Sequence, residues 1–406
     1  MEQTASMHAI RAAHAFDGER FLQGGATVLV EGDRIIGVEP GGFEVPEGVE
    51  LTSYDGTLLP GLVDAHVHLV SDGEMGSLER AGTLDDDGLD AMIEGSLRAQ
   101  AAAGVTTVRD LGDVGFRTLA WRDRAEPGLP RIVAAGPPLT TPGGHCHYLG
   151  GEVEGVAGMR AAVAAHAARG VDVIKVMASG GMLTLGSDVF GVQFTAEELR
   201  AAVDAAHDAG LRLLAHAHSL AGIEHALAAG ADGIEHFSCL TENGPSWSED
   251  LLARVAEAGV VVGPTHGQLL DRLPTLEQLP PAIVAVFEKF GMRPDEMRAR
   301  RMEVFTRVRA HGIPVCSGLD AGAAPPKPHG ALWSAVDWLA DAYPVDEALA
   351  TATSFAAEQC GLGAETGRLR ASYAADLLVV DGDLSRDVKR LSQPVAVWVR
   401  GLAQPS

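Results

Sequence analysis

The chain has 406 residues, of which 46% are apolar and 5% aromatic, a balance that favours an α/β protein over an all-β one. Its formal net charge of −24 argues against nucleic acid or anionic membrane as a partner and means that an anionic substrate needs a local cationic pocket. The four cysteines are widely spaced, which predicts buried free thiols. The sequence has no signal-like N-terminus and no apolar run of membrane-spanning length, so we expect a cytoplasmic protein, either a monomer or a homo-oligomer.

Short strands are expected at both ends of the chain. Residues 26–38 have the pattern of a hairpin that turns at 31–34, and residues 376–383 and 395–401 read as two further strands. Neither end carries enough strands to bury a sheet alone. We therefore expect residues 1–57 and 362–406 to form one small composite β-sandwich.

Between these ends, over residues 58–361, apolar runs alternate with Ala-rich helical stretches. Eight runs are expected to be strands: 58–66, 105–110, 131–135, 171–177, 211–216, 233–236, 260–265 and 313–320. Helices are expected at 90–103, 158–169, 196–209, 220–229, 249–258 and 331–340, with a capping box at 195–198. Eight such cycles favour a (β/α)8 TIM-like barrel over a doubly wound sheet, because the glycine-rich phosphate turn of the latter is missing.

Metal-compatible side chains lie at the ends of several predicted strands, which is where a barrel carries its chemistry. They are His66, His68, His216, His218, Glu235, His236 and Asp320. Neutral imidazole and carboxylate are the groups that divalent transition metals bind. Lys175 lies among them; burial would lower its pKa, and a neutral amine can react with CO₂ to give a carbamate that bridges two cations.

The motifs at 63–68, 173–178, 215–218, 234–236 and 318–322 resemble those of the amidohydrolase superfamily. The chain is most similar to its imidazolonepropionase-related Xaa-Pro dipeptidases, N-acyl amino acid and dipeptide carboxypeptidases, and ochratoxin amidohydrolases. The resemblance implies two divalent metals, expected to be Zn²⁺, with carboxylated Lys175 bridging them. The implied ligands are His66, His68 and Asp320 for one metal, and His216 and His236 for the other. Relatives use the first histidine of the pair 216/218, but both lie on one strand face, so the pattern leaves that choice open.

The resemblance also implies a hydrolase acting on C–N bonds. A metal-bridging hydroxide would attack the amide of a dipeptide or N-acyl amino acid that carries a free carboxylate, with Asp320 as the proton shuttle. The expected substrate contacts are His145, His147, Tyr148, His218 and His266. The alternatives are a mononuclear cyclic amidohydrolase or deaminase, against which Lys175 argues, and a non-catalytic scaffold, against which the complete ligand set argues.

Two further features have an open role in the sequence. Arg109 could bind a substrate carboxylate, but we favour a structural pair with Asp110 or Asp113. Residues 274–301 are bounded by prolines and then charged, which is typical of an inserted helix pair. This segment is either a lid over the pocket or a plain surface excursion.

Overall fold

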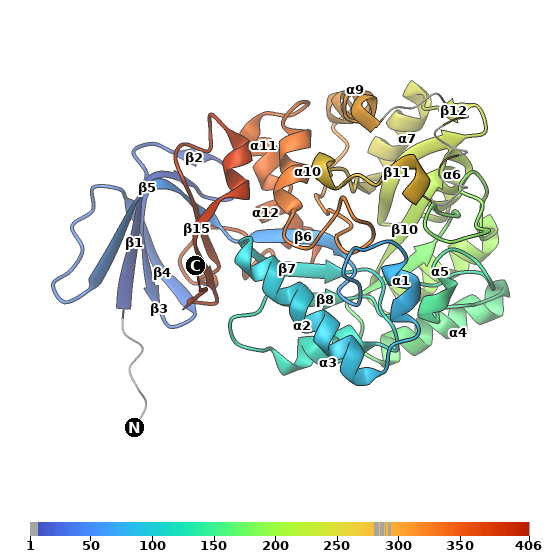
Figure 1. Ribbon diagram of the computed structural model, residues 1–406, viewed down its shortest axis with the longest axis horizontal. Helices are drawn as coiled ribbons and strands as arrows, with labels where there is room; N and C mark the ends of the chain where they lie inside the picture. Colours follow the sequence, from blue (N-terminus) through green and yellow to red (C-terminus); the bar gives the residue numbers. More distant parts are fainter. Residues whose placement is uncertain (1–6, 280–283, 285–287, 289, 291–293, 406) are drawn as a thin grey trace.

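The computed structural model describes residues 7–279, 284, 288, 290 and 294–405, which form a mixed α/β fold. Strands from both ends of the chain lie together on one side of the molecule, beside a larger part in which strands and helices alternate (Figure 1). Within the described ranges, no helix has the length and apolarity needed to cross a membrane.

The terminal strands form one eight-stranded sheet in the order β16-β15-β14-β5-β1-β3-β4, with β2 paired to β1. These strands are β1 (Met7–Phe16), β2 (Phe21–Leu22), β3 (Ala26–Glu31), β4 (Arg34–Pro40), β5 (Glu50–Pro60), β14 (Leu377–Val380), β15 (Pro394–Val399) and β16 (Leu402–Ala403). The predicted hairpin is therefore confirmed as β3–β4, and both termini contribute to one sheet. A second, facing sheet is not assigned in the described part of the chain, so the sandwich stays a prediction.

Strand β5 joins the two halves of this sheet. Its first part pairs in parallel with β1, and its last residues, Thr57–Pro60, pair antiparallel with Leu377–Val380 of β14. Apolar side chains from both halves, including Ile10, Leu58 and Trp398, pack in one cluster. The predicted domain boundary after residue 57 thus lies inside β5.

Parallel strands form two further sheets, β6-β7-β8 and β9-β10-β11-β13, with the short β12 antiparallel to β11. Their bounds are β6 (Leu62–Val67), β7 (Val105–Asp110), β8 (Arg131–Ala134), β9 (Val173–Met177), β10 (Arg212–Ser219), β11 (Gly233–Thr241), β12 (Gly244–Pro245) and β13 (Val261–Gly263). Most of their residues are buried, as expected for parallel strands covered on both faces.

The eighth predicted strand, 313–320, is not assigned as a strand. It makes only isolated parallel bridges, from Val315 to Val262 of β13, and then from Ala321 to Val67 of β6. A third bridge, Leu139 to Val176, connects the β8 side to β9. Asp320, the last residue of the segment, has a left-handed backbone conformation with φ of 66°, which an extended strand does not contain.

The helices cover the outside of the parallel strands (Figure 1). They are α1 (Ser77–Ala81), α2 (Asp86–Ala102), α3 (Arg117–Arg124), α4 (Gly155–Ala168), α5 (Ala196–Asp208), α6 (Leu220–Ala229), α7 (Glu249–Ala258), α9 (Pro294–Ala310), α10 (Leu332–Leu339), α11 (Val345–Ala350) and α12 (Ser354–Gln359). Short 3₁₀ helices are η1 (His147–Leu149), η2 (Leu270–Arg272), η3 (Leu276–Gln278) and η4 (Val388–Ser392). The capping box at Thr195 and Glu198 is confirmed at the start of α5. Of the predicted helix pair, α9 is the second half, whereas much of the first half lies outside the described residues.

Candidate metal centre

His66, His68 and Asp320 form one buried group of candidate ligands where β6 and the 313–320 segment meet. One ligand atom from each lies within 4.8 Å of the others. The Asp320 carboxylate Oδ1 is 3.5 Å from His66 Nε2 and 3.2 Å from His68 Nε2. The strained backbone of Asp320 therefore directs its carboxylate to the two imidazoles.

Hydrogen bonds orient both imidazoles of this group. His66 Nδ1 donates to Oε2 of Glu235 (2.7 Å), and His68 Nδ1 donates to the carbonyl oxygen of Gly112 (3.1 Å). Because both acceptors lack a proton, each Nε2 keeps its lone pair for a metal. Burial lowers the pKa of His66 to about 4, so this ring is neutral at physiological pH.

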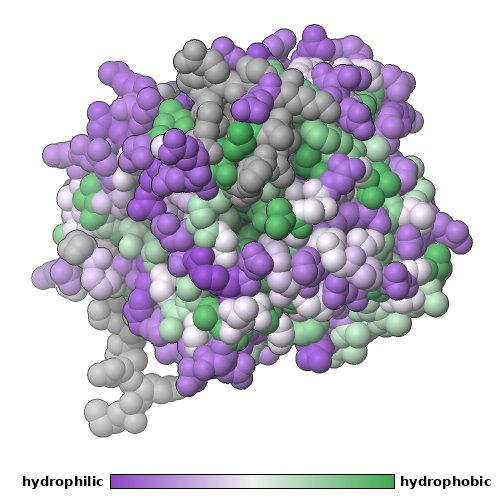
Figure 2. All heavy atoms as spheres, turned by 45° about the vertical axis from the view of Figure 1, so that its right-hand side comes forward, coloured by the Kyte–Doolittle hydropathy of each residue, from purple (hydrophilic) through white to green (hydrophobic). Residues whose placement is uncertain are grey.

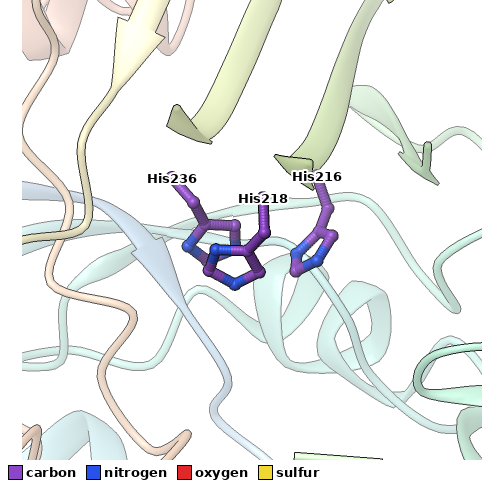
Figure 3. Close-up of side chains that lie close together, drawn as sticks. All are labelled: His216, His218 and His236. Carbon is purple, nitrogen blue, oxygen red and sulfur yellow. The ribbon is translucent and has the colours of Figure 1, made fainter. Parts of the chain in front are cut away.

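His216, His218 and His236 form a second group on β10 and β11, close to where the regular parallel pairing of these strands stops, and their rings converge (Figure 3). The ring centre of His236 is 4.4 Å from that of His216 and 4.3 Å from that of His218. Burial, followed by the neighbouring histidines, lowers the pKa of His236 well below its usual range. The structure places His216 and His218 equally close to His236, so the choice between them stays open.

Lys175 on β9 is almost fully buried in the wall of the same cavity. Burial lowers the pKa of its amine. Burial is the main cause of the lowered pKa values of His66, His216 and His236, and the charge of Lys175 lowers them further. Lys175 is therefore within electrostatic reach of both ligand groups. Among the residues that the structure describes, none forms a hydrogen bond or an ion pair with this amine, although the carboxylates of Glu235 and Asp320 act on its charge.

A cavity of about 250 Å³ opens over both histidine groups. His145 and His266 both line this cavity. The ring centre of His145 lies 4.6 Å from that of His216, and the Nε2–H of His266 donates to the carbonyl oxygen of Ala335 (3.0 Å). His147 and Tyr148 do not line it. Apolar side chains make up much of the remaining wall, and in Figure 2 apolar residues border the centre of this face of the molecule.

Arg109 has a different partner from the expected one. Its guanidinium is buried under the site, donates to the carbonyl of Ala65 (2.8 Å) and lies 3.6 Å from Glu235. Asp110 instead accepts from backbone amides, and Asp113 accepts from Thr118. The predicted pair with Asp110 or Asp113 is therefore wrong, because Arg109 points across the parallel strands to β11.

The sequence patterns did not identify what three residues near the site do. Glu235 orients His66, while Arg301 of α9 and Lys327 line the cavity. The Glu235-His236 motif indicated a metal-compatible strand end but not which of the two faces the metal. For Arg301 and Lys327, no spacing or periodicity pointed to the site.

The donor set fits divalent transition metals. Each group offers imidazole nitrogens, and the first group adds a carboxylate. His66 and His68 carry their protons on Nδ1, which leaves Nε2 of each ring free to bind a metal. Such nitrogen and carboxylate sets suit Zn²⁺ and related ions better than Mg²⁺ or Ca²⁺.

Comparison with known proteins gives consistent matches. The model of the amidohydrolase family matches residues 57–403. An uncharacterized protein of Mycobacterium tuberculosis is 30% identical over 287 residues, 68% of this chain and 67% of that protein. Ochratoxinase of Aspergillus niger is 25% identical over 401 residues, 91% of this chain and 80% of that protein. A solved Xaa-Pro dipeptidase with bound methionine has a TM-score of 0.83 at 24% identity, with 99% of this chain and 100% of that chain covered.

Proposed function

The chain belongs to the amidohydrolase family and is a hydrolase acting on C–N bonds, and on this premise we propose that it is a binuclear, metal-dependent amidohydrolase. The proposed substrate is a dipeptide or N-acyl amino acid with a free carboxylate. The observation that carries the proposal is the convergence of two candidate ligand groups on one cavity, with a buried, unpaired lysine in reach of both. The ochratoxinase relative supports a small-molecule substrate.

The same proposal extends to the architecture. We interpret the isolated bridges at Leu139, Val262 and Val67 as closing the parallel strands and residues 313–320 into a (β/α)8 TIM-like barrel. Residues 58–361 would then be the hydrolase barrel, and residues 1–57 and 362–406 the composite β domain.

The proposed ligand assignment uses every member of the two ligand groups except His218, together with Lys175. His66, His68 and Asp320 would hold one cation, His216 and His236 the other, and carboxylated Lys175 would bridge them. Bound divalent cations supply a water that is acidic enough to act as a nucleophile near neutral pH, and they polarise a carbonyl oxygen. Carboxylation of Lys175 is supported by its burial and lowered pKa, which favour the neutral amine.

Asp320 is the proposed proton carrier. Its carboxylate lies between the two imidazoles of the first group and Lys327, whose ammonium is 3.4 Å from Oδ2. It would accept a proton from the nucleophilic water and deliver it to the leaving nitrogen. His218 is proposed to contact substrate, because its ring lines the cavity and is anchored by its Nδ1, which lies 2.9 Å from Ser238 Oγ.

Metal analysis combined with a substrate screen tests the proposal. We expect close to two metal ions per chain, and hydrolysis of at least one member of a library of dipeptides and N-acyl amino acids. A content near one ion, together with turnover of cyclic amides or aminated heterocycles, would favour the mononuclear alternative. Protein that binds no metal and hydrolyses nothing would instead be a scaffold.

A further inference from the structure

Two cationic side chains line the cavity beside the candidate ligands, although the chain as a whole is strongly acidic. The Arg301 guanidinium donates to Ser238 Oγ (3.0 Å) and to the carbonyl oxygens of His236 (2.9 Å) and Pro264 (2.6 Å). All three acceptors are neutral, and no carboxylate among the described residues pairs with Arg301. A largely desolvated cation without a counter-ion is costly unless a ligand supplies the charge.

Both side chains have donors to spare. A guanidinium carries five N–H bonds; the three hydrogen bonds of Arg301 leave one on Nη1 and one on Nε without an acceptor in the described part of the chain. The Lys327 ammonium donates to the carbonyl of Thr265 (2.7 Å) and to Asp320 Oδ2 (3.4 Å), which leaves its third N–H. Burial lowers the pKa of Arg301 only to about 10, so its charge persists at neutral pH.

The two cations flank the two candidate ligand groups. Ser238 links Arg301 to His218 of the second group, since its Oγ lies 2.9 Å from His218 Nδ1. Lys327 contacts Asp320 of the first group. A substrate whose amide carbonyl lies at the metals would therefore present a neighbouring carboxylate to these two side chains.

We propose that Arg301, with Lys327 beside it, binds the free carboxylate of the substrate and selects amides that lie next to a carboxylate. This inference rests on the proposed amidohydrolase function and adds the residue that recognises the anion. Arg301 suits the task because its spare N–H groups can each donate a charge-assisted hydrogen bond to a carboxylate oxygen. Apolar residues that also line the cavity, among them Met182, Leu183 and Leu273, would contact the acyl part of the substrate.

Paired substrates test this role. One is an N-acyl amino acid that the wild-type enzyme cleaves, and the other is its C-terminal carboxamide, which lacks the negative charge. For the wild-type enzyme we expect kcat/KM to be higher on the acid. Arg301→Gln should lower kcat/KM on the acid by at least about 10-fold, because a charge-assisted hydrogen bond is lost, and should leave the carboxamide nearly unchanged. The free amino acid product should also inhibit the variant more weakly.

Arg298→Gln is the matched control. Arg298 lies one turn earlier on α9 and pairs with Asp337 and Asp341, outside the cavity lining. It should change the ratio of kcat/KM on the two substrates by less than about twofold, because Arg298 does not line the cavity. If Arg301→Gln does not fold, Arg301→Lys, which keeps the positive charge, replaces it in the experiment. Its decrease in kcat/KM should again be confined to the acid substrate.

The outcomes separate the two proposals. If the wild-type enzyme cleaves neither substrate nor any other amide in the screen, the proposed function fails and this inference fails with it. If it cleaves acid and carboxamide equally, or if Arg301 variants lower both rates by the same factor, the carboxylate role is overturned while the amidohydrolase function stands.

Discussion

Glu235 offers the sharpest test of how the first ligand group is held. Its carboxylate accepts from His66 Nδ1 at 2.7 Å and lies 3.6 Å from the guanidinium of Arg109. Burial alone would raise the pKa of Glu235, but His66, Lys175 and Arg109 lower it, so the group is ionised. Glu235→Gln keeps the volume and one acceptor oxygen but removes the charge that both partners face.

The expected effects on metal binding and on folding differ in size. Losing an outer partner of a ligating imidazole typically weakens metal binding by about 10- to 100-fold, or about 1.4 to 2.7 kcal/mol. Arg109 would also lose its ion-pair partner, and an uncompensated buried charge costs about 3 to 5 kcal/mol of unfolding free energy. We therefore expect a large loss of stability in the metal-free protein and a separate loss of Zn²⁺ affinity.

A double variant separates these two effects. Glu235→Gln with Arg109→Met removes the uncompensated charge, so it should recover part of the stability but none of the Zn²⁺ affinity. Denaturant unfolding of metal-free protein measures the first quantity, and competition with a chelator measures the second. A Zn²⁺ affinity of Glu235→Gln within twofold of wild type would refute the orienting role of Glu235.

Gly263 gives an independent route to the same result. A methyl group at this position would meet the Glu235 carboxylate, which its two partners hold in place. Gly263→Ala should therefore displace Glu235 from His66 and weaken Zn²⁺ binding without a change in charge. Gly259→Ala, at the end of α7, is the control. The added methyl would have open space around it, but the backbone is left-handed there, so this variant should lower stability without changing Zn²⁺ affinity.

Three further predictions concern the bridge, the proton carrier and the thiols. Lys175→Ala should bind fewer than two metals per chain by elemental analysis, and a short carboxylic acid such as acetate should restore part of the activity; full metal content in the variant would contradict the bridging role. Asp320→Asn should retain the circular dichroism spectrum of wild type but lose at least about 100-fold in kcat, since a general acid–base group contributes about that much; near-native turnover would exclude it as the proton carrier. Burial raises the pKa of the Cys146 and Cys239 thiols to about 12, so fewer than one thiol per native chain should react with a disulfide reagent at pH 8, against four after denaturation.

Local patterns predicted much of this molecule. Helices α6 and α7 have the bounds expected from the sequence, because a serine cap starts each one and a left-handed glycine ends it. The histidines at 66, 216 and 236 were found because apolar runs place them at strand ends, and parallel strands end on the same side of a sheet.

Features that depend on distant contacts were not predicted. The orienting role of Glu235 needs His66, which is far away in the sequence, and the partner of Arg109 lies across the strands rather than next to it. Arg301 enters the cavity only because α9 packs near the end of β11. The 313–320 segment has the composition of a strand, but it makes only isolated bridges to its neighbours, and its last residue, Asp320, has a left-handed backbone conformation.

The pairing of β5 affects how the chain folds during its synthesis. This strand is followed almost directly by β6 and the first histidines. At Leu58, however, one edge of β5 pairs with Val379 of β14, more than three hundred residues later in the chain. At a synthesis rate of about 5–20 residues per second, that edge stays open for tens of seconds after it leaves the ribosome. An apolar edge that waits this long can pair with another chain. Loss of the last strands would therefore affect yield and aggregation before it affected chemistry, although these strands contribute no residue to the cavity.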